Sequence, residues 1–296
     1  MNSATERRRG VVAATAGVLV LSFDALLVRL TDAPGADIAF WRGVLVLLSA
    51  GSISWLRRRH VDWPQSTLHW LRGLMIAALY GVNALLFVLA INNTHVANTV
   101  VILASAPLFA AGLAWIIFRE PTPVHTLAAI LVAIVGVMIV FSSSLGQPGQ
   151  LGDLLALILA ANTALTLTLL RRMPDLPRLP VVAGSGIFSA LISWPFAAPL
   201  QLEAASYGWL AIMGLVQIPL ATVLIFNATR YLPSAEVSLF LLIETILGPL
   251  WVWWILGESM PGPTLAGGSL ILGGIILNTL LSIRQRRRQP PVAAEK

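Results

Sequence analysis

Apolar residues fill the chain in blocks of about 20 residues, and short polar or charged stretches separate these blocks. A block of this length suits a helix that crosses about 30 Å of hydrocarbon, because each helical residue rises about 1.5 Å. Transmembrane strands would alternate apolar and polar positions over about 10 residues, whereas residues 128–141 are continuously apolar. The pattern therefore predicts an all-α membrane protein.

Proline, glycine and charged residues between the blocks indicate where the helices end. The first apolar run resembles a secretory signal peptide, but it is longer than the core of such a peptide and further spans follow it. We therefore expect it to be the first membrane-spanning helix. The ten expected helices cover residues 10–30, 38–56, 67–91, 95–118, 123–141, 151–171, 181–199, 206–230, 234–256 and 262–283.

Composition supports lipid as the main solvent of this chain. Hydrophobic residues make up 57% of the sequence and charged residues only 11%, compared with about 25% charge in a typical soluble domain. The net charge of +6 does not predict a nucleic-acid partner, because such binding needs a basic face on a folded soluble surface. The chain contains no cysteine, so disulfides and thiolate metal sites are excluded. We expect no cofactor.

The basic residues also predict the orientation of the helices, because cytoplasmic loops carry most of the lysine and arginine. With ten helices, the arginines at 7–9, 57–59, 119, 171, 172 and 178 and the basic stretch at 284–288 fall on one side. The opposite loops contain Asp32, Asp37, Asp153, Glu203 and Glu258. We expect both termini in the cytoplasm and the protein in the cell inner (plasma) membrane.

The second half of the chain repeats the first. A shift of 138 residues aligns Ala90 with Ala228, Trp115 with Trp253, Glu120 with Glu258, Pro123 with Pro261 and Gly136 with Gly274. Five helices separate each pair, so the two halves have opposite orientations. Inverted repeats are typical of carriers that bind a solute near the bilayer midplane. We expect repeats at residues 1–145 and 146–285, followed by a cytoplasmic tail at 286–296.

Short motifs in both halves have a common arrangement. The first half has Arg42, Pro107, Arg119-Glu120 and Gly136-Val137; the second has Gly-Asp-Leu-Leu-Ala at 152–156, Glu244, Gly257-Glu258 and Gly273-Gly274. In this order and spacing, the chain resembles the EamA-type families of the drug/metabolite transporter (DMT) superfamily. The resemblance implies a cavity lined by helices one to four and six to nine, with helices five and ten outside it.

The sequence departs from this family pattern at two positions. The ninth helix has Glu244-Thr245 in place of Glu-Pro, with Pro249 one turn later, so a helix break expected there is displaced. The first helix has Phe23-Asp24 where members often have a tryptophan followed by glycine or asparagine. An acid at this position indicates a specialised subgroup.

Three charged residues inside the expected spans are the leading candidates for binding or gating. Asp24 and Arg42 lie at similar depths in neighbouring helices, so they can form a pair. Glu244 lies near the midplane, where it is a candidate for proton coupling. Charges in spans cost about 2.5–3.5 kcal/mol and are tolerated next to a cavity or a partner. A purely structural ion pair and a hydrogen-bonded glutamic acid are the alternatives.

Several uncharged polar residues could also contact a solute. Asn83, Asn162 and Gln217 fall at mid-depth, where amides either recognise a solute or fasten helices together. Tyr80 and Trp41 could stack on a substrate. Small-residue faces at Ala129/Ala133 and Thr264/Gly268 suit close packing within the chain or a dimer. The oligomeric state is left open as monomer or homodimer.

These residues predict a secondary transporter, most simply an exporter of a small metabolite such as an amino acid or amphipathic drug. A carrier of lipid- or nucleotide-linked groups would need more cavity cations than Arg42. A membrane enzyme would need a nucleophile with its base or a metal cluster, and neither occurs in the sequence. A channel filter or ring of charge is also missing, and a scaffold would leave Asp24 and Glu244 unexplained.

Overall fold

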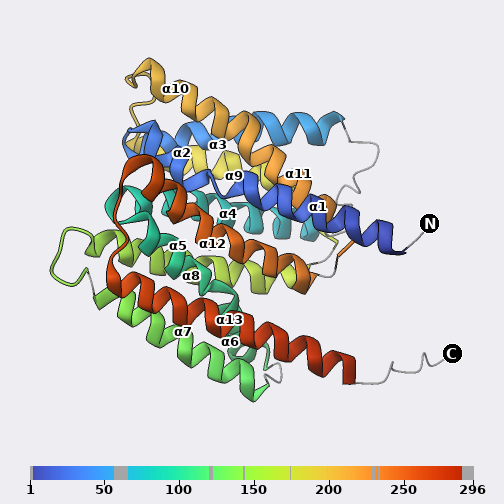
Figure 1. Ribbon diagram of the computed structural model, residues 1–296. Coiled ribbons are helices and arrows are strands. Elements are labelled where there is room, and N and C mark those ends of the chain that lie inside the picture. Colours follow the sequence, from blue (N-terminus) through green and yellow to red (C-terminus); the bar gives the residue numbers. More distant parts are fainter. Residues whose placement is uncertain are drawn as a thin grey trace.

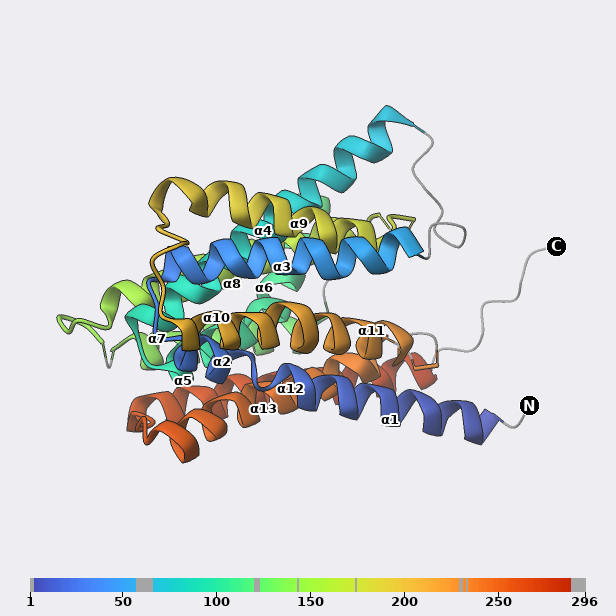
Figure 2. The same cartoon turned by 90° about the horizontal axis from the view of Figure 1, so that it is seen from above.

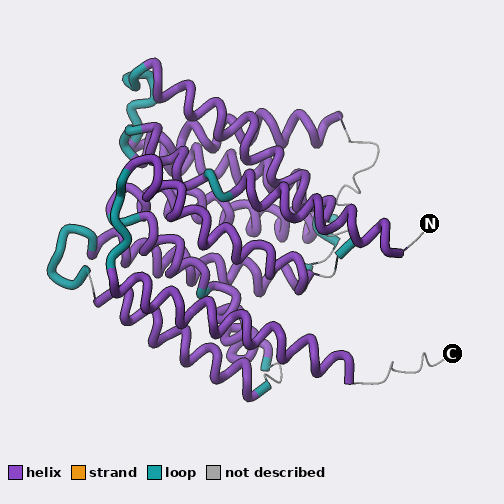
Figure 3. The backbone as a smooth tube through the Cα atoms, viewed as in Figure 1, coloured by secondary structure: helices purple, strands orange, loops and turns teal. Residues whose placement is uncertain are grey.

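The computed structural model describes residues 3–56, 66–119, 123–142, 144–173, 175–228, 231–232 and 234–288. Within these ranges all regular secondary structure is helical, which confirms the predicted all-α class (Figure 1). Figure 3 shows that the connecting loops gather mainly at the two ends of the helix bundle. Both the start of the first helix and the end of the last lie at one end of the bundle, here named the terminal end. The opposite end is named the far end.

The helices follow the predicted order in both halves. The first half contains α1 (Ser3–Leu21), α2 (Asp24–Thr31), α3 (Gly35–Leu56), α4 (Thr67–Asn93), α5 (Val96–Ala104), α6 (Ala106–Phe118) and α7 (Val124–Ser142). The second half contains α8 (Gln150–Arg171), α9 (Arg178–Ser193) with a 3₁₀ turn (Trp194–Phe196), α10 (Ala204–Ala211), a π-helical segment (Ile212–Gln217), α11 (Ile218–Ala228), α12 (Ser234–Leu256) and α13 (Gly262–Arg288).

Ten passes through the bundle result from these helices. Nine segments of the described chain are long and apolar enough to cross a membrane. The remaining pass is α12, which has 23 residues and an apolar stretch at Leu242–Leu256. Pro249 lies inside α12, yet the helix continues through it, so no displaced break occurs near Glu244.

Two of the predicted continuous helices are interrupted. The first pass breaks at Ser22 and Phe23, between α1 and α2, and the fourth breaks at Ser105, between α5 and α6. Pro107 follows the second break, and proline has no N–H to donate to the preceding turn. At the break, both the hydroxyl and the backbone N–H of Ser105 donate to the carbonyl of Ile102. The predicted seventh helix also ends early, because Pro195 lies in a 3₁₀ turn after Ser193.

Glycine contacts between α7 and α13 support the inverted repeat. A Cβ atom on Gly136 would lie 2.8 Å from the carbonyl oxygen of Gly267, and a Cβ on Gly274 would lie 3.8 Å from that of Ala129. The 138-residue shift relates these two contacts, because Gly136 corresponds to Gly274 and Ala129 corresponds to Gly267. Ala133 and Ile271, which also correspond to each other, are fully buried between them. The two helices therefore cross close to a twofold pseudosymmetry axis.

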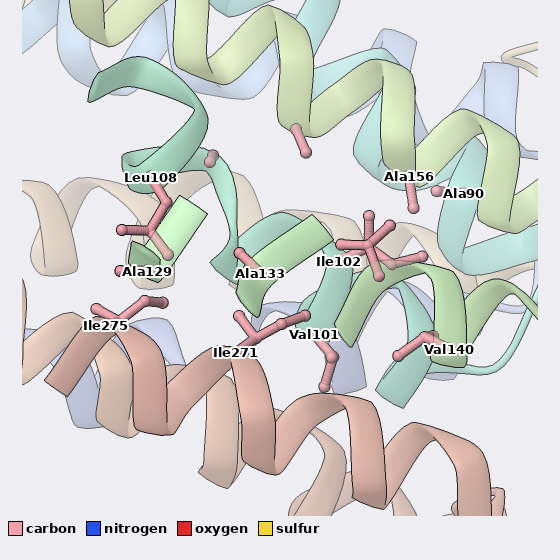
Figure 4. Packing of buried hydrophobic residues seen from close by; sticks show 13 residues of the cluster. Ala90, Val101, Ile102, Leu108, Ala129, Ala133, Val140, Ala156, Ile271 and Ile275 are labelled. Carbon is pink, nitrogen blue, oxygen red and sulfur yellow. The ribbon is translucent and has the colours of Figure 1, made fainter. Parts of the chain in front are cut away.

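The small-residue faces predicted from the sequence are buried within the chain. Ala129 and Ala133 pack in a cluster with Ile271 and with residues of α5 and α8 (Figure 4). Thr264 is buried, and a Cβ on Gly268 would lie 3.1 Å from the side chain of Val101. These faces therefore join helices of one chain and do not provide a dimer surface. Figure 1 shows α7 and α13 together at one edge of the bundle.

We predict that Gly136→Val destabilises the protein by about 1–3 kcal/mol, the usual cost of overpacking a tight contact. The added side chain would collide with the backbone of Gly267 and the side chain of Ile271. Gly273→Val is the control, because a Cβ on Gly273 meets no atom within 4 Å. Thermal unfolding of the purified variants in detergent measures the difference. Equal stabilities of the two variants would contradict the close crossing.

Candidate functional site

A buried ion pair joins the first two passes. Asp24 is the first residue of α2, and its Oδ2 atom accepts a hydrogen bond from Nη2 of Arg42 in α3 at 2.8 Å. The side chains are 7% and 13% exposed. The guanidinium carbon of Arg42 also lies 5.5 Å from the centroid of the Phe87 ring. The structure therefore brings together the two residues whose equal depths predicted a pair, while their role in binding remains a prediction.

The ion pair has unused hydrogen-bonding capacity. Oδ1 of Asp24 and Nη1 of Arg42 are both buried, and neither atom has a partner in the described part of the chain. Glu244 of α12 is half-buried and lies close enough for its charge to interact with those of Asp24 and Arg42. Three charged side chains from both halves of the chain thus occupy one region, and two of their buried polar atoms have no hydrogen-bond partner among the described residues.

The break between α1 and α2 is held by side chains from the second half. The amide nitrogen of Gln217 donates to the carbonyl oxygens of Val20 and Leu21 at 3.3 and 3.4 Å. These carbonyls precede the break and belong to the last turn of α1, whose final carbonyls have no partner within the helix. Gln217 therefore fastens the broken helix, although its buried Oε1 atom has no partner among the described residues.

An aromatic residue of α12 also contacts this break. Nε1 of Trp251 donates to the hydroxyl oxygen of Ser22 at 3.0 Å. The Trp251 ring stacks on Phe23, with 4.9 Å between the ring centroids. Asp24 follows Phe23 directly, so these contacts fix the position of the carboxylate at the start of α2.

Asn83 and Asn162 form a second polar group, between α4 and α8. Nδ2 of Asn162 donates to Oδ1 of Asn83 at 2.9 Å and to the carbonyl of Leu79 at 3.0 Å. The Thr163 hydroxyl also donates to Oδ1 of Asn83, at 3.1 Å. The two amides therefore fasten α4 to α8 in this conformation. Solute recognition by these residues is still a prediction.

Tyr80 lies in a different apolar cluster. Its side chain packs against a group formed by Ile76, Ala77, Leu176 and Val181. Phe23 and Trp251, in contrast, flank the region of Asp24. Tyr80 therefore belongs to a different packing cluster from the rings beside Asp24, and stacking of Tyr80 on a substrate stays a prediction.

A fully buried acid organises the far end of the bundle. Asp153 lies in the first turn of α8, where Thr94 and Ser144 donate to its two oxygens at 2.6 Å each. The amide nitrogen of Asn98 also donates to both oxygens, at 3.1 and 3.0 Å. Thr264 of α13 then donates to Oδ1 of Asn98. This far-end network connects α5, α8 and α13. Asp153 was expected among the acids of the polar loops, and its burial was not predicted.

Glu258 forms a second link at the far end. Its carboxylate lies 3.0 Å from Nη2 of Arg29 in α2 and accepts from the backbone N–H of Val96 at 2.7 Å. Arg29 donates in turn to the carbonyl of Thr94 at 2.8 Å. Glu258 therefore attaches the loop before α13 to α2 and α5 of the first half. The repeat counterpart, Glu120, lies outside the described residues.

Ten helical passes, two halves related by an inverted repeat and buried charges contributed by both halves define a membrane transporter. The profile of the EamA-like transporter family matches residues 8–142 and 150–280, so the chain belongs to this family, which lies within the DMT superfamily. The protein is accordingly a multi-pass membrane transporter and not an enzyme.

Comparison with solved structures supports the same fold. A crystal structure of a protein with 18% sequence identity superposes with a TM-score of 0.64, covering 96% of this chain and 99% of that chain. No curated protein matches the sequence significantly. The likeness to the crystal structure concerns the fold alone and does not identify a substrate.

Proposed function

We propose that this transporter exports a small, partly apolar metabolite, such as an amino acid or an amphipathic drug, by alternating access. The supporting observation is the cluster of Asp24, Arg42 and Glu244, which combines charges from both halves within the membrane. Burying a charged group in a span is costly unless it serves a partner or a cavity. A solute bound between the halves would be that partner.

The two atoms of the ion pair that lack partners indicate which hydrogen-bonding groups a bound solute should carry. Oδ1 of Asp24 accepts a hydrogen bond, and Nη1 of Arg42 donates one. A solute with both a donor and an acceptor, such as the ammonium and carboxylate of an amino acid, satisfies the two atoms together. The surrounding rings of Phe23, Phe87 and Trp251 suit an apolar portion of the same molecule.

Glu244 is the proposed site of proton coupling. With both acids ionised, Asp24 and Glu244 outnumber the one cation, Arg42, so the cluster has an excess of negative charge. This excess is unfavourable in the low dielectric of the bilayer. A proton on Glu244 or a cationic group of the solute would balance it, and an exchange of one for the other would couple export to proton entry.

The test is solute flux in proteoliposomes. A thermal-shift screen of amino acids, nucleosides and amphipathic cations first identifies a ligand, whose labelled form is then used for flux. We expect Asp24→Asn and Glu244→Gln each to lower flux about 10-fold or more, because a hydrogen bond to a charged group contributes about 1.5–3 kcal/mol. The control is Asp175→Asn, which neutralises an exposed acid. Unchanged flux in the double variant of Asp24 and Glu244 would refute the proposed role.

The terminal end is proposed to face the cytoplasm, with the protein in the cell inner (plasma) membrane. Because the sequence contains no cysteine, single cysteines report accessibility without background. We expect Gln147→Cys, in the exposed loop at the far end, to react with a membrane-impermeant maleimide on intact cells. Asp175→Cys, exposed at the terminal end, should react only after the cells are opened. Labelling of Asp175→Cys but not of Gln147→Cys on intact cells would contradict this orientation and place the terminal end outside the cytoplasm.

A further inference from the structure

An apolar cavity of about 310 Å³ lies at the terminal end of the bundle, between α3, α4 and α9. Its wall includes Leu47, Gly51, Ala77, Val181 and Gly184. The volume lies at the lower limit of small-molecule sites, which enclose about 300–1,000 Å³. The cavity is separate from the charged cluster, since Asp24, Arg42 and Glu244 are not among the residues that line it.

The rim of this cavity lies on the outer surface of the bundle, where we expect lipid. Trp55 and Leu74 line it and are 62% and 48% exposed, and Trp70 and Ile187 are also exposed. Large apolar side chains on the outside of a membrane-spanning bundle contact acyl chains, and tryptophan favours the level of the headgroups. A molecule dissolved in the bilayer can therefore reach the cavity from the side.

One buried polar atom lies in the otherwise apolar wall. Ser54 lines the cavity and is buried, and its hydroxyl has no hydrogen-bond partner in the described part of the chain. His69, which also lines the cavity, has a partner, because its Nδ1 atom lies 2.7 Å from the Ser66 hydroxyl. A buried hydroxyl without a partner is unfavourable, so Ser54 is the group available to a ligand.

The inverted repeat shows which residues correspond to the cavity wall. On α3 and α9, a Cβ on Gly43 would approach the backbones of Gly186 and Ala190, and a Cβ on Gly186 would approach those of Gly43 and Leu47. The contact of Gly43 with Ala190 is therefore equivalent to the contact of Gly186 with Leu47, if Gly43 corresponds to Gly186 and Leu47 to Ala190. The same offset pairs each of the other residues of α3 with a residue of α9 or of the segment that follows it. The 138-residue shift aligns α4 with α10, the π-helical segment and α11.

Aromatic rings fill the corresponding space at the far end. Phe40 lies 5.6 Å from Trp41 and 5.3 Å from Trp194, and Trp41 lies 5.8 Å from Tyr207, measured between ring centroids. The indole N–H of Trp41 and the hydroxyl of Tyr207 both donate to the carbonyl of Pro199, at 2.8 Å each. We name these four residues the aromatic plug.

Smaller residues replace the plug at the terminal end. Each of the four replacements lines the cavity. They are Ala183 in place of Phe40, Gly184 in place of Trp41, Gly51 in place of Trp194 and His69 in place of Tyr207. The cavity is therefore the space that the plug occupies in the other half of the molecule. Figure 2 shows the start of α4 diverging from α3 at this end.

We propose that this cavity binds a small aromatic molecule that carries one hydrogen-bonding group and enters from the bilayer. The far end indicates the shape of the ligand, since indole and phenol rings fill the same space there and each donates one hydrogen bond. At the terminal end the ligand supplies the rings, and the Ser54 hydroxyl takes the part of the Pro199 carbonyl. Binding in this cavity does not require the charged cluster proposed for transport, so the two proposals can fail separately.

Equilibrium binding of N-phenyl-1-naphthylamine, which has aromatic rings and a single N–H, tests the site. The full chain is reconstituted in phosphatidylcholine nanodiscs, and protein-free discs measure partition into lipid. We expect saturable binding to one site in excess of partition. Gly51→Trp should weaken it about 10-fold or more by filling a cavity of this size. A Cβ at this position meets only the Leu47 side chain, at 3.9 Å, so the helix accepts the change.

Two further variants keep the test specific. Leu48→Trp adds the same ring on a lipid-facing position of α3 outside the cavity and should leave binding unchanged. Ser54→Ala should weaken binding about 2- to 10-fold, the effect of one neutral hydrogen bond. Asp24→Asn should bind the probe normally even where solute flux is lost, which separates this site from the proposed transport site.

Three results would overturn the proposal. If binding of the probe to the wild type does not exceed its partition into protein-free discs, the protein has no such site. If Gly51→Trp and Leu48→Trp weaken binding equally, the site does not lie in this cavity. A phospholipid that remains bound to the purified wild type in native mass spectrometry, but not to Gly51→Trp, would assign the cavity to an acyl chain in place of an aromatic solute.

Discussion

Arg42→Met is expected to lower the free energy of unfolding by about 3–5 kcal/mol, the typical cost of removing one partner from a buried ion pair. The substitution keeps the length of the side chain but leaves the Asp24 carboxylate, which is 7% exposed, without its cation. It also removes the guanidinium next to the Phe87 ring. Equilibrium unfolding of the purified protein in mixed detergent micelles measures the loss.

A double-mutant cycle separates the ion pair from other effects of the substitution. Asp24→Asn combined with Arg42→Met removes both charges, so the double variant should be more stable than Arg42→Met alone. If the double variant is as unstable as the sum of the single variants, the two residues do not interact in the folded protein. In that case the geometry around the break in the first pass would need another explanation.

Asp153→Leu is expected to destabilise the protein by about 3 kcal/mol or more, because a hydrogen bond to a charged group contributes about 1.5–3 kcal/mol. The substitution deprives Thr94, Asn98 and Ser144 of their acceptor at a position without solvent access. Asp153→Asn should have an intermediate effect, because its amide nitrogen would face the donors. Unfolding in the same detergent system measures both variants.

Neutralising an exposed acid provides the control for Asp153. Asp175→Asn removes one carboxylate from a loop at the terminal end and should change stability by less than about 0.5 kcal/mol. An effect of Asp153→Leu no larger than that of Asp175→Asn would contradict the far-end network. Recovery of stability by Asp153→Glu would instead be compatible with it, provided that the longer side chain still reaches the donors.

Helix number, helix order and the inverted repeat were predictable from the sequence. Each depends on a feature that extends over many residues, such as an apolar block long enough to span the bilayer or the 138-residue match. The interruptions at Ser22 and Ser105 were not predictable in this way, because they extend over one or two residues. The first depends on Gln217 and Trp251, which approach it only in the folded bundle.

The candidate site was predicted in part. Equal depth in adjacent helices indicated the pairing of Asp24 with Arg42, because charges in spans need partners. The acids Asp153 and Glu258 were assigned to polar loops, since acids near helix ends are usually solvated. A hydroxyl and an amide four residues apart, Thr94 and Asn98, were the available signal of a buried acceptor. Their partner Asp153 is 55 residues from Asn98 and could not be identified without the fold.

The short helix α2 has a mechanical consequence. Asp24 and Arg29 lie on the same eight-residue helix, five residues or about 7.5 Å apart along its axis. Asp24 belongs to the charged cluster, and Arg29 is bonded to Glu258 at the far end. Because α1 and α2 are not one continuous helix, α2 can tilt as a rigid unit when the contacts of Gln217 and Trp251 at the break are released. A motion that pulls Arg29 away from Glu258 would also displace the carboxylate of Asp24. If Asp24 binds the solute as proposed, α2 would therefore link solute binding to opening of the far end.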